Sequence, residues 1–109
     1  RTIGVPTINM ILPPHKLLPP NGVYVTEVLV DGKNYMGVTN IGYKPTVSDE
    51  HIVGVETYID NFDKNIYGEK IVVSFIQFIR PEQKFESVEE LRMQMQSDIQ
   101  VSRKIYLQQ

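Results

Sequence analysis

The sequence contains no cysteine among its 109 residues, so it can form neither disulfides nor thiolate metal sites. It also lacks a basic excess, because 11 Lys and Arg residues stand against 13 Asp and Glu residues for a formal net charge of -2. This balance argues against a protein that wraps nucleic acid or lies on an anionic membrane, since both tasks need positive charge. No apolar run approaches the ~20 residues of a membrane-spanning helix.

What is present describes one folded domain. Hydrophobic residues make up 41% of the chain and charged residues 22%, which is typical of globular proteins and unlike disordered ones. The length fits a single domain over residues 1–109. The chain begins with Arg1 and shows no signal peptide, so we expect a fragment of a longer protein. The missing cysteines are a weak sign of a reducing compartment, and location has to follow from function.

Prolines and turn residues divide the first part of the chain. Four prolines at positions 13, 14, 19 and 20 predict an irregular loop over residues 10–21, either a functional loop or a simple connector. After it, Asp31-Gly32 separates two β-rich runs, 22–30 and 33–39, and predicts a hairpin with positive φ at both turn positions.

A second pair of strands and a helix follow. Residues 53–59 and 69–79 are rich in β-branched and aromatic residues, with a polar connection over 60–68. The second run is apolar on both faces, which predicts a central strand. Ser87 and Glu90 form a capping box that begins a helix. Its apolar stripe consists of Val88, Leu91, Met95, Ile99 and Tyr106, and we expect Met93 and Met95 to fill the core.

These elements predict a fold dominated by antiparallel strands, with one carboxy-terminal helix. Several short strands joined by hairpins tend to close on themselves and remove their edges. We therefore expect a small β-barrel, or a strongly bent sheet, with the helix packed outside it.

Three polar segments are candidates for a site. Thr7 and Asn9 are two residues apart, so in an extended segment they present two neutral oxygens to one point, as Mg²⁺ accepts. Residues 37–46 run from a strand into a turn that contains Gly42. Glu56 is a carboxylate within an apolar strand. Each has a simpler interpretation: a Thr/Asn turn, ordinary turn chemistry and a solvent-facing glutamate.

The order of the motifs carries more information than any single one. The chain reads Gly-x-Pro-Thr-x-Asn, Thr-Asn-Ile-Gly-x-x-Pro-Thr, Glu-Thr-x-Ile-x-x-Phe-Asp, Tyr-Gly, Phe-Ile-Arg-Pro-Glu and Lys-Phe-x-Ser-x-Glu-x-Leu. This series, from Arg1 to about Arg103, resembles the riboflavin kinase family. In particular it resembles the carboxy-terminal kinase module of bacterial bifunctional riboflavin kinase/FAD synthetases.

The resemblance implies a six-stranded Greek-key β-barrel with a carboxy-terminal helix. It also implies an ATP-dependent riboflavin kinase, which transfers the γ-phosphoryl group of ATP to the 5′-hydroxyl of riboflavin and gives FMN and ADP. Glu56 would be the catalytic base, and Thr7 and Asn9 would bind Mg²⁺. The residues expected to contact ATP or flavin are Gly4, Pro6, Thr7, Asn9, Asn40, Arg80 and Arg103. Either of the helix residues Asp98 and Arg103 could face the ligand, but we expect an exposed solubilising role for them.

The sequence also departs from the family pattern. The first barrel strand and a glycine- and arginine-containing loop normally precede the Pro-Thr-x-Asn motif, and only Arg1 remains of them. Ile8 replaces the usual alanine within that motif. No adenylyltransferase module is present, although we expect one in the full-length protein, which would be cytoplasmic. The alternative is a truncated barrel that binds flavin or nucleotide and turns over poorly.

Overall fold

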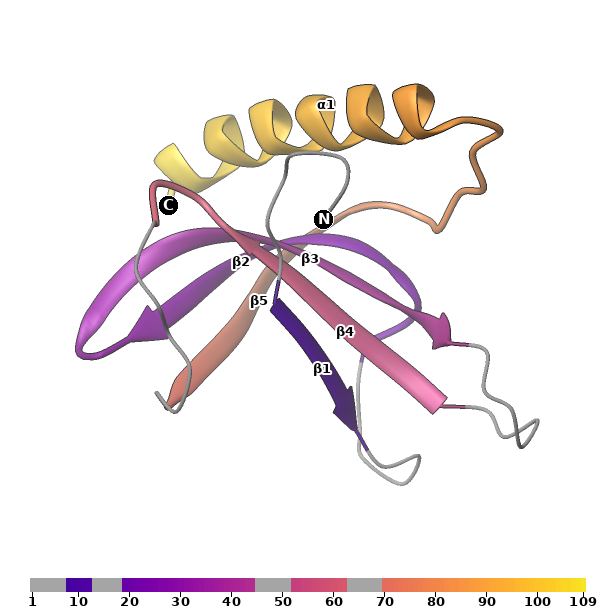
Figure 1. Ribbon diagram of the computed structural model, residues 1–109. Coiled ribbons are helices and arrows are strands. Elements are labelled where there is room, and N and C mark those ends of the chain that lie inside the picture. The colour runs from indigo at the N-terminus through magenta and orange to yellow at the C-terminus, as the bar shows by residue number, and fades with distance from the viewer. Residues whose placement is uncertain (1–7, 13–18, 45–51, 63–69) are drawn as a thin grey trace.

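The computed structural model describes residues 8–12, 19–44, 52–62 and 70–109, which form five strands and one helix (Figure 1). The elements are β1 (Ile8–Leu12), β2 (Gly22–Val30), β3 (Lys33–Lys44), β4 (Ile52–Ile59), β5 (Ile71–Arg80) and α1 (Val88–Leu107). All strand pairs are antiparallel, and the spatial order is β1-β4-β3-β2-β5.

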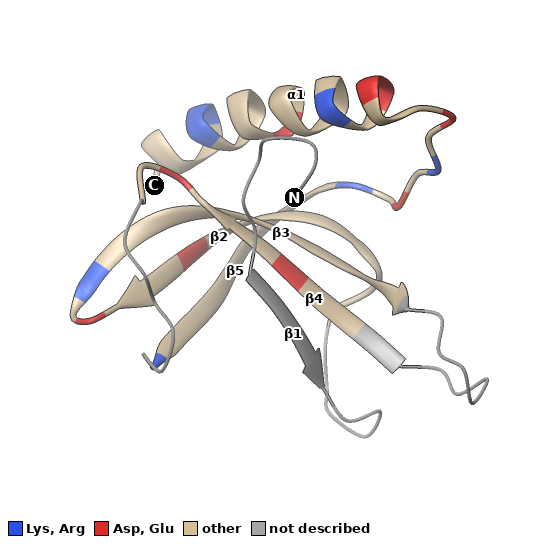
Figure 2. Cartoon of the chain, viewed as in Figure 1, with Lys and Arg blue, Asp and Glu red and all other residues tan. Residues whose placement is uncertain are grey.

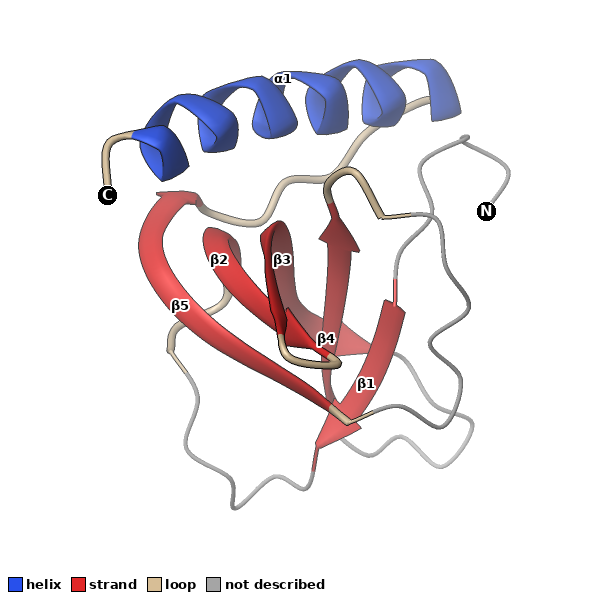
Figure 3. Ribbon diagram, turned by 90° about the vertical axis from the view of Figure 1, so that its left-hand side faces the viewer, coloured by secondary structure: helices blue, strands red, loops and turns tan. Residues whose placement is uncertain are grey.

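The sheet has Greek-key connections and is strongly bent. Strands β2, β3 and β4 follow one another as neighbours, and β5 returns to pair with β2. Figure 3 shows the sheet curving beneath α1, with the helix lying across it. The expected antiparallel sheet with one carboxy-terminal helix is therefore confirmed. Among the described residues β1 and β5 are the two ends of the sheet, so it is not closed into a complete barrel.

The hairpin between β2 and β3 forms for the predicted reason. Asp31 has a φ of 51° and Gly32 a φ of 80°, so both turn residues are in the left-handed region. Turns of this kind match the right-handed twist of the two strands that they join. Nine register pairs follow from Gly22↔Ile41 to Val30↔Lys33.

The two faces of the sheet bury different sets of side chains. The face that carries Tyr24, Thr26 and Val28, which we call the core face, lines the inside of the bend. Its apolar residues form two clusters: Tyr24, Ile41, Val55 and Phe75 in one, and Val28, Val30, Ile59, Tyr35, Phe62, Ile71 and Val73 in the other. The opposite face, which carries Val23, Val25 and Glu27, is the helix face.

Helix α1 packs on the helix face and is tied to it by side-chain hydrogen bonds. The Tyr106 hydroxyl donates to Glu27 Oε2 at 3.1 Å. Ile99 and Ser102 are buried on the inner side of the helix. Ser87 is the N-cap, since its hydroxyl accepts from the Glu90 amide at 3.1 Å while Glu90 accepts from the Glu86 amide. The predicted helix start at Ser87 is therefore confirmed.

Three expectations about the strands are wrong in part. Residues 10–12 belong to β1 rather than to a loop. A proline restricts only its own backbone and that of the residue before it, and the preceding residue favours an extended conformation, so a strand can run up to that residue. Gly42 lies within β3, not in a turn, because the strand runs on to Lys44. The run over 69–79 is β5, at the end of the sheet rather than at its centre.

The burial of β5 explains this last error. None of its residues is fully buried, exposed positions recur along its length, and its pairing with β2 has two register shifts. Val72 and Phe78 are 43% and 46% exposed. An apolar run does not distinguish a strand covered on both sides from one at the end of a sheet.

The helix also differs from the predicted stripe. Val88 is 56% exposed and Met93 is 63% exposed, so neither fills the core. Asp98 is 4% exposed instead, because it has an ionic partner on the sheet. The predicted stripe is therefore right for Leu91, Met95, Ile99 and Tyr106, which are buried or partly buried, and wrong for Val88.

Candidate active site

Asn9, Asn40 and Glu56 hold the same register position on three neighbouring strands. Asn9 of β1 and Asn40 of β3 are both Cα partners of Glu56, because β4 lies between β1 and β3. The same line continues from Asn40 to Val23 of β2 and from Val23 to Arg80 of β5. Pairing thus brings residues from five separate segments onto one line across the sheet.

This line lies on the helix face. Thr57, next to Glu56, is buried on the core face, and successive strand residues point to opposite sides. Arg80, on the same register line, reaches α1. Glu56 and Asn40 therefore project toward the side of the sheet on which the helix lies, with Asn40 exposed and Glu56 partly buried.

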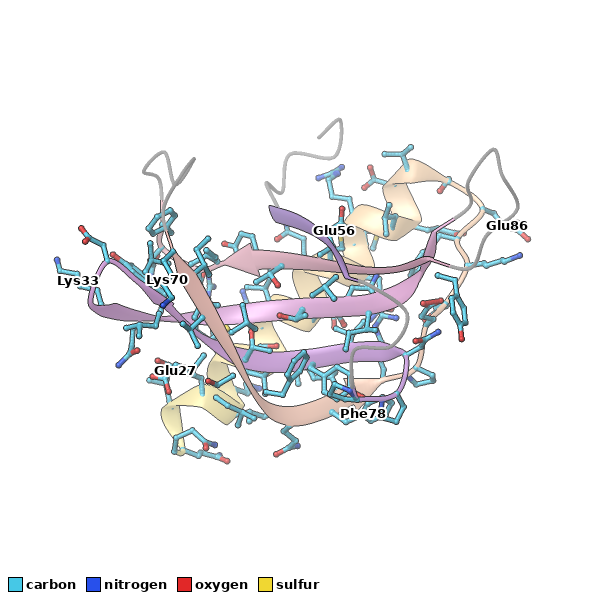
Figure 4. All side chains as sticks on the ribbon, turned by 90° about the horizontal axis from the view of Figure 1, so that it is seen from below. Glu27, Lys33, Glu56, Lys70, Phe78 and Glu86 are labelled. Atoms are coloured by element: carbon cyan, nitrogen blue, oxygen red, sulfur yellow. The ribbon has the colours of Figure 1, made fainter. Side chains whose placement is uncertain are left out.

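Glu56 is the one acidic residue of β4 and forms the red segment midway along that strand in Figure 2. Figure 4 labels its side chain. Within the described part of the chain, its carboxylate makes no hydrogen bond or ion pair. A partly buried carboxylate without a partner among the described residues can accept a proton from a ligand.

Arg80, at the other end of the line, is held by the helix. Its Nε donates to Asp98 Oδ1 at 3.0 Å and its Nη2 donates to Asp98 Oδ2 at 2.7 Å. Gln94 donates to the same carboxylate at 3.0 Å, and the Arg80 guanidinium lies 5.9 Å from the centre of the Phe85 ring. The side chains of Arg80 and Asp98 are 18% and 5% exposed. This two-point ion pair links the end of β5 to the middle of α1, so the expected exposed role of Asp98 is wrong.

Arg103 forms a second link between sheet and helix. Its Nε and Nη2 donate to the two carboxylate oxygens of Asp60, each at 2.8 Å. The Tyr58 hydroxyl donates to Asp60 Oδ1 at 3.0 Å. Arg103 is thus a partner of a buried carboxylate just after β4 rather than a solubilising residue.

The electrostatics of this cluster follow from those contacts. The hydrogen bonds from Arg103 hold the pKa of Asp60 below its ordinary value, although burial acts in the opposite direction. Burial, and then the hydrogen bond to Asp60, raise the pKa of the Tyr58 hydroxyl. Asp60 therefore stays ionised, and Tyr58 stays protonated, across the neutral range.

Glu82 is a candidate site residue that sequence reasoning missed. Its carboxyl carbon would lie 2.7 Å from a Cβ on Gly42, so the Glu82 side chain occupies the space above this glycine. Gly42 pairs with Gly54 on β4 and is two residues from Asn40 on the same face. The loop between β5 and α1 therefore places a second carboxylate beside the register line. The sequence feature that could have identified Glu82 is its place as the glutamate of the Phe-Ile-Arg-Pro-Glu motif.

The remaining expected residues are not all described. Gly4, Pro6 and Thr7 lie outside the described residues, so the Thr7–Asn9 arrangement stays a prediction. In the parts of the chain that the structure describes, no three His, Cys, Asp or Glu side chains are grouped to hold a metal ion. In the same parts, no helix has the length and apolarity needed to cross a membrane.

Comparison with known proteins identifies the family of the chain. Residues 1–106 match the family model described as Flavokinase, riboflavin kinase. The chain is 40% identical over 106 residues to a bifunctional riboflavin kinase/FMN adenylyltransferase of Listeria monocytogenes, covering 97% of this chain and 34% of that protein. It is 40% identical over 99 residues to an RNA-binding riboflavin kinase of Bacillus subtilis, covering 91% of this chain and 42% of that protein. The chain spans less than half the length of these relatives.

A solved structure has the same fold. It is described as a macrolide-efflux protein from Streptococcus pneumoniae and superposes with a TM-score of 0.83 at 34% identity, covering 94% of this chain and 33% of that one. The family model covers nearly all of the sequence and includes every site residue named above. The chain belongs to the riboflavin kinase family.

Proposed function

We propose that this domain transfers the γ-phosphoryl group of ATP to the 5′-hydroxyl of riboflavin, giving FMN and ADP. The observation that carries the proposal is the register line in which Glu56 lies between Asn9 and Asn40. Family membership supplies the reaction class, and this line supplies a base next to the Asn40 amide on the helix face. Phosphoryl transfer asks a protein mainly for such positioning and for charge neutralisation.

Glu56 acts as the general base in this proposal. It accepts the proton of the 5′-hydroxyl as the hydroxyl oxygen bonds to the γ-phosphorus and the bond to the bridging oxygen of ADP breaks. An alcohol is a far weaker acid than a carboxylic acid, so the proton moves late, when the oxygen is already bonding to phosphorus. The carboxylate has no competing partner among the described residues.

Thr7 and Asn9 would hold Mg²⁺ together with the phosphates of ATP. The donor set fits this ion, because Mg²⁺ prefers oxygen ligands, is held by few protein groups and completes its octahedron with waters and phosphate oxygens. The register position of Asn9 opposite Glu56 supports this role. When bound, the ion neutralises negative charge on the phosphates. Gly4 and Pro6 belong to the same motif and would contact the nucleotide.

Asn40, Arg80 and Arg103 border the substrates in this proposal. Asn40 is exposed beside Glu56 and can donate to or accept from a ligand. Arg80 and Arg103 already direct donors to Asp98 and Asp60, so we assign them chiefly to holding the helix over the site. The flavin would lie between the sheet and α1, next to the loop that carries Glu82.

The relatives suggest the larger setting. Because the Listeria relative is named as both a kinase and an FMN adenylyltransferase, we propose that this domain works beside an adenylyltransferase module, which converts FMN to FAD. Use of ATP and riboflavin is consistent with a cytoplasmic location. A role without nucleic acid remains our expectation, although one relative is named as RNA-binding.

The proposal is tested by incubating the chain with riboflavin, ATP and Mg²⁺ and separating flavins by chromatography. We expect FMN to appear with one ADP for each FMN, and no FMN when EDTA removes the metal. Binding of riboflavin with no FMN formed would favour the alternative of a binding domain. If neither riboflavin nor ATP changes the melting temperature, the proposal is wrong.

A further inference from the structure

Three buried threonines on neighbouring strands form a hydrogen-bonded ladder on the core face. Thr39 Oγ1 lies 2.9 Å from Thr57 Oγ1 and 3.0 Å from Thr26 Oγ1. Thr26, Thr39 and Thr57 are 0%, 0% and 1% exposed. The ladder therefore crosses β2, β3 and β4 within the core, out of contact with solvent.

The ladder lies directly behind the proposed catalytic line. Thr57 follows Glu56 along β4, Thr39 precedes Asn40 along β3, and Thr39 and Thr57 are register partners. Since neighbouring strand residues point to opposite faces, each of these two hydroxyls lies behind one residue of the Asn40–Glu56 pair. The hydrogen bond between them adds a side-chain link to the backbone pairing of the two strands at this position.

A glycine makes room for the ladder. Thr26 is paired with Gly37, and a Cβ on that glycine would lie 2.5 Å from Thr26 Oγ1 and 2.6 Å from Val28 Cγ2. The missing side chain lets Thr26 lean diagonally toward Thr39. Packing alone does not require hydroxyls here, because valine has nearly the shape of threonine and avoids burying a polar group.

We infer that Thr57 and Thr39 are positioning residues that set the register of β3 against β4 and so hold Glu56 in line with Asn40. Buried polar groups that satisfy one another favour a single arrangement, because a shifted pairing leaves each hydroxyl unsatisfied. Thr26 completes the ladder on β2, one strand further from Glu56, and has no part in this positioning. The inference rests on the proposed function only for its kinetic readout.

The test compares matched variants in the riboflavin kinase assay. Thr57→Val removes the hydroxyl next to Glu56, Thr57→Ser keeps it, and Thr26→Val removes an equally buried hydroxyl from the other end of the ladder. We expect Thr57→Val to lower kcat roughly tenfold with little change in the KM for riboflavin, since small displacements of a reacting group are costly. Thr57→Ser should restore kcat. In Thr26→Val, kcat should stay within about twofold of the wild-type value, although the melting temperature falls by about as much as in Thr57→Val.

A second measurement does not depend on activity. Amide hydrogen exchange should become faster at residues 39–40 and 56–57 in Thr57→Val, and much less so in Thr26→Val. If Thr57→Val fails to fold, Thr39→Val takes its place with the same criteria. Equal kinetic losses in the valine variants at positions 57 and 26, or unchanged kcat and exchange in Thr57→Val, would overturn the inference. A wild-type chain that makes no FMN would instead refute the proposed function, and the exchange measurement would still decide the positioning role.

Discussion

Asn40 and Glu56 face each other across β3 and β4 as direct register partners, on the side of the sheet that carries the helix. The two residues come from two different motifs of the sequence. Their pairing places a proton acceptor beside an amide, next to the register position of Asn9 on β1. The predictions below test this line and the contacts that hold the helix over it.

Replacing Glu56 by glutamine should remove the base and keep the shape of the site. We expect turnover to fall by about 10² or more, because the amide cannot accept the proton, with riboflavin affinity nearly unchanged. Turnover is measured from FMN formation and affinity from flavin fluorescence. A Glu56→Gln variant with near-normal turnover would show that Glu56 is not the base.

Asn9→Ala should act through the metal and ATP. Loss of one oxygen donor weakens a site that demands near-octahedral geometry, so the Mg²⁺ and ATP concentrations needed for half-maximal rate should both rise. Riboflavin affinity without nucleotide should not change. A selective loss of riboflavin binding would contradict the assignment.

Asp98→Ala should destabilise the domain more than the loss of an exposed ion pair does. Arg80 would lose its two-point partner in a poorly solvated position, and breaking such a pair costs about 3–5 kcal/mol. Glu89→Ala is the matched control on the same helix, because Glu89 pairs with Arg92 in solvent and its loss should cost less than about 1 kcal/mol. Urea unfolding measures both, and equal losses would contradict a supporting role for the Arg80–Asp98 pair.

The Asp60–Arg103 pair predicts a specific acid sensitivity. Because folding lowers the pKa of Asp60, its ionised form stabilises the native state above the ordinary aspartate pKa of about 3.9. That contribution is lost as the pH falls through this value toward the lower pKa of the folded state. Asp60→Asn should therefore be less stable at neutral pH and should lose less stability on acidification.

The control for this experiment is Asp31→Asn, which removes the same charge at an exposed turn. Its unfolding free energy should follow the wild-type curve from pH 6 down to about pH 3. If the unfolding free energy of Asp60→Asn falls with decreasing pH as steeply as that of the wild type, the acid sensitivity comes from other carboxylates.

Ser87→Ala should weaken the start of the helix. The serine hydroxyl satisfies the Glu90 amide, and loss of such a cap costs about 0.5–2 kcal/mol. Ser97→Ala, at an exposed position within the same helix, should be neutral or slightly stabilising because alanine is the better helix former. Similar unfolding midpoints for the two variants would show that the cap contributes nothing.

The sequence by itself determined the local elements and the family. Asp31-Gly32 specifies the hairpin because few residue pairs accept positive φ at both positions, and Ser87 with Glu90 specifies the helix start because their side chains satisfy free amides. The order of the short motifs identified the family, which the match over residues 1–106 confirms. These signals act over a few residues, so they can be recognised without knowing the fold.

Only the tertiary structure decided which distant residues meet. The pairing of β1 with β4 and of β5 with β2 depends on long-range packing. Together with the pairing of β3 with β4 and with β2, it placed Asn9, Glu56, Asn40 and Arg80 on one line. The same pairing put β5 at the end of the sheet although its composition suggested the centre. Asp98 and Asp60 are buried because Arg80 and Arg103 reach them from elements remote in sequence. A charged residue is buried where a partner offsets its lost hydration, and that partner is set by the fold rather than by the neighbouring sequence.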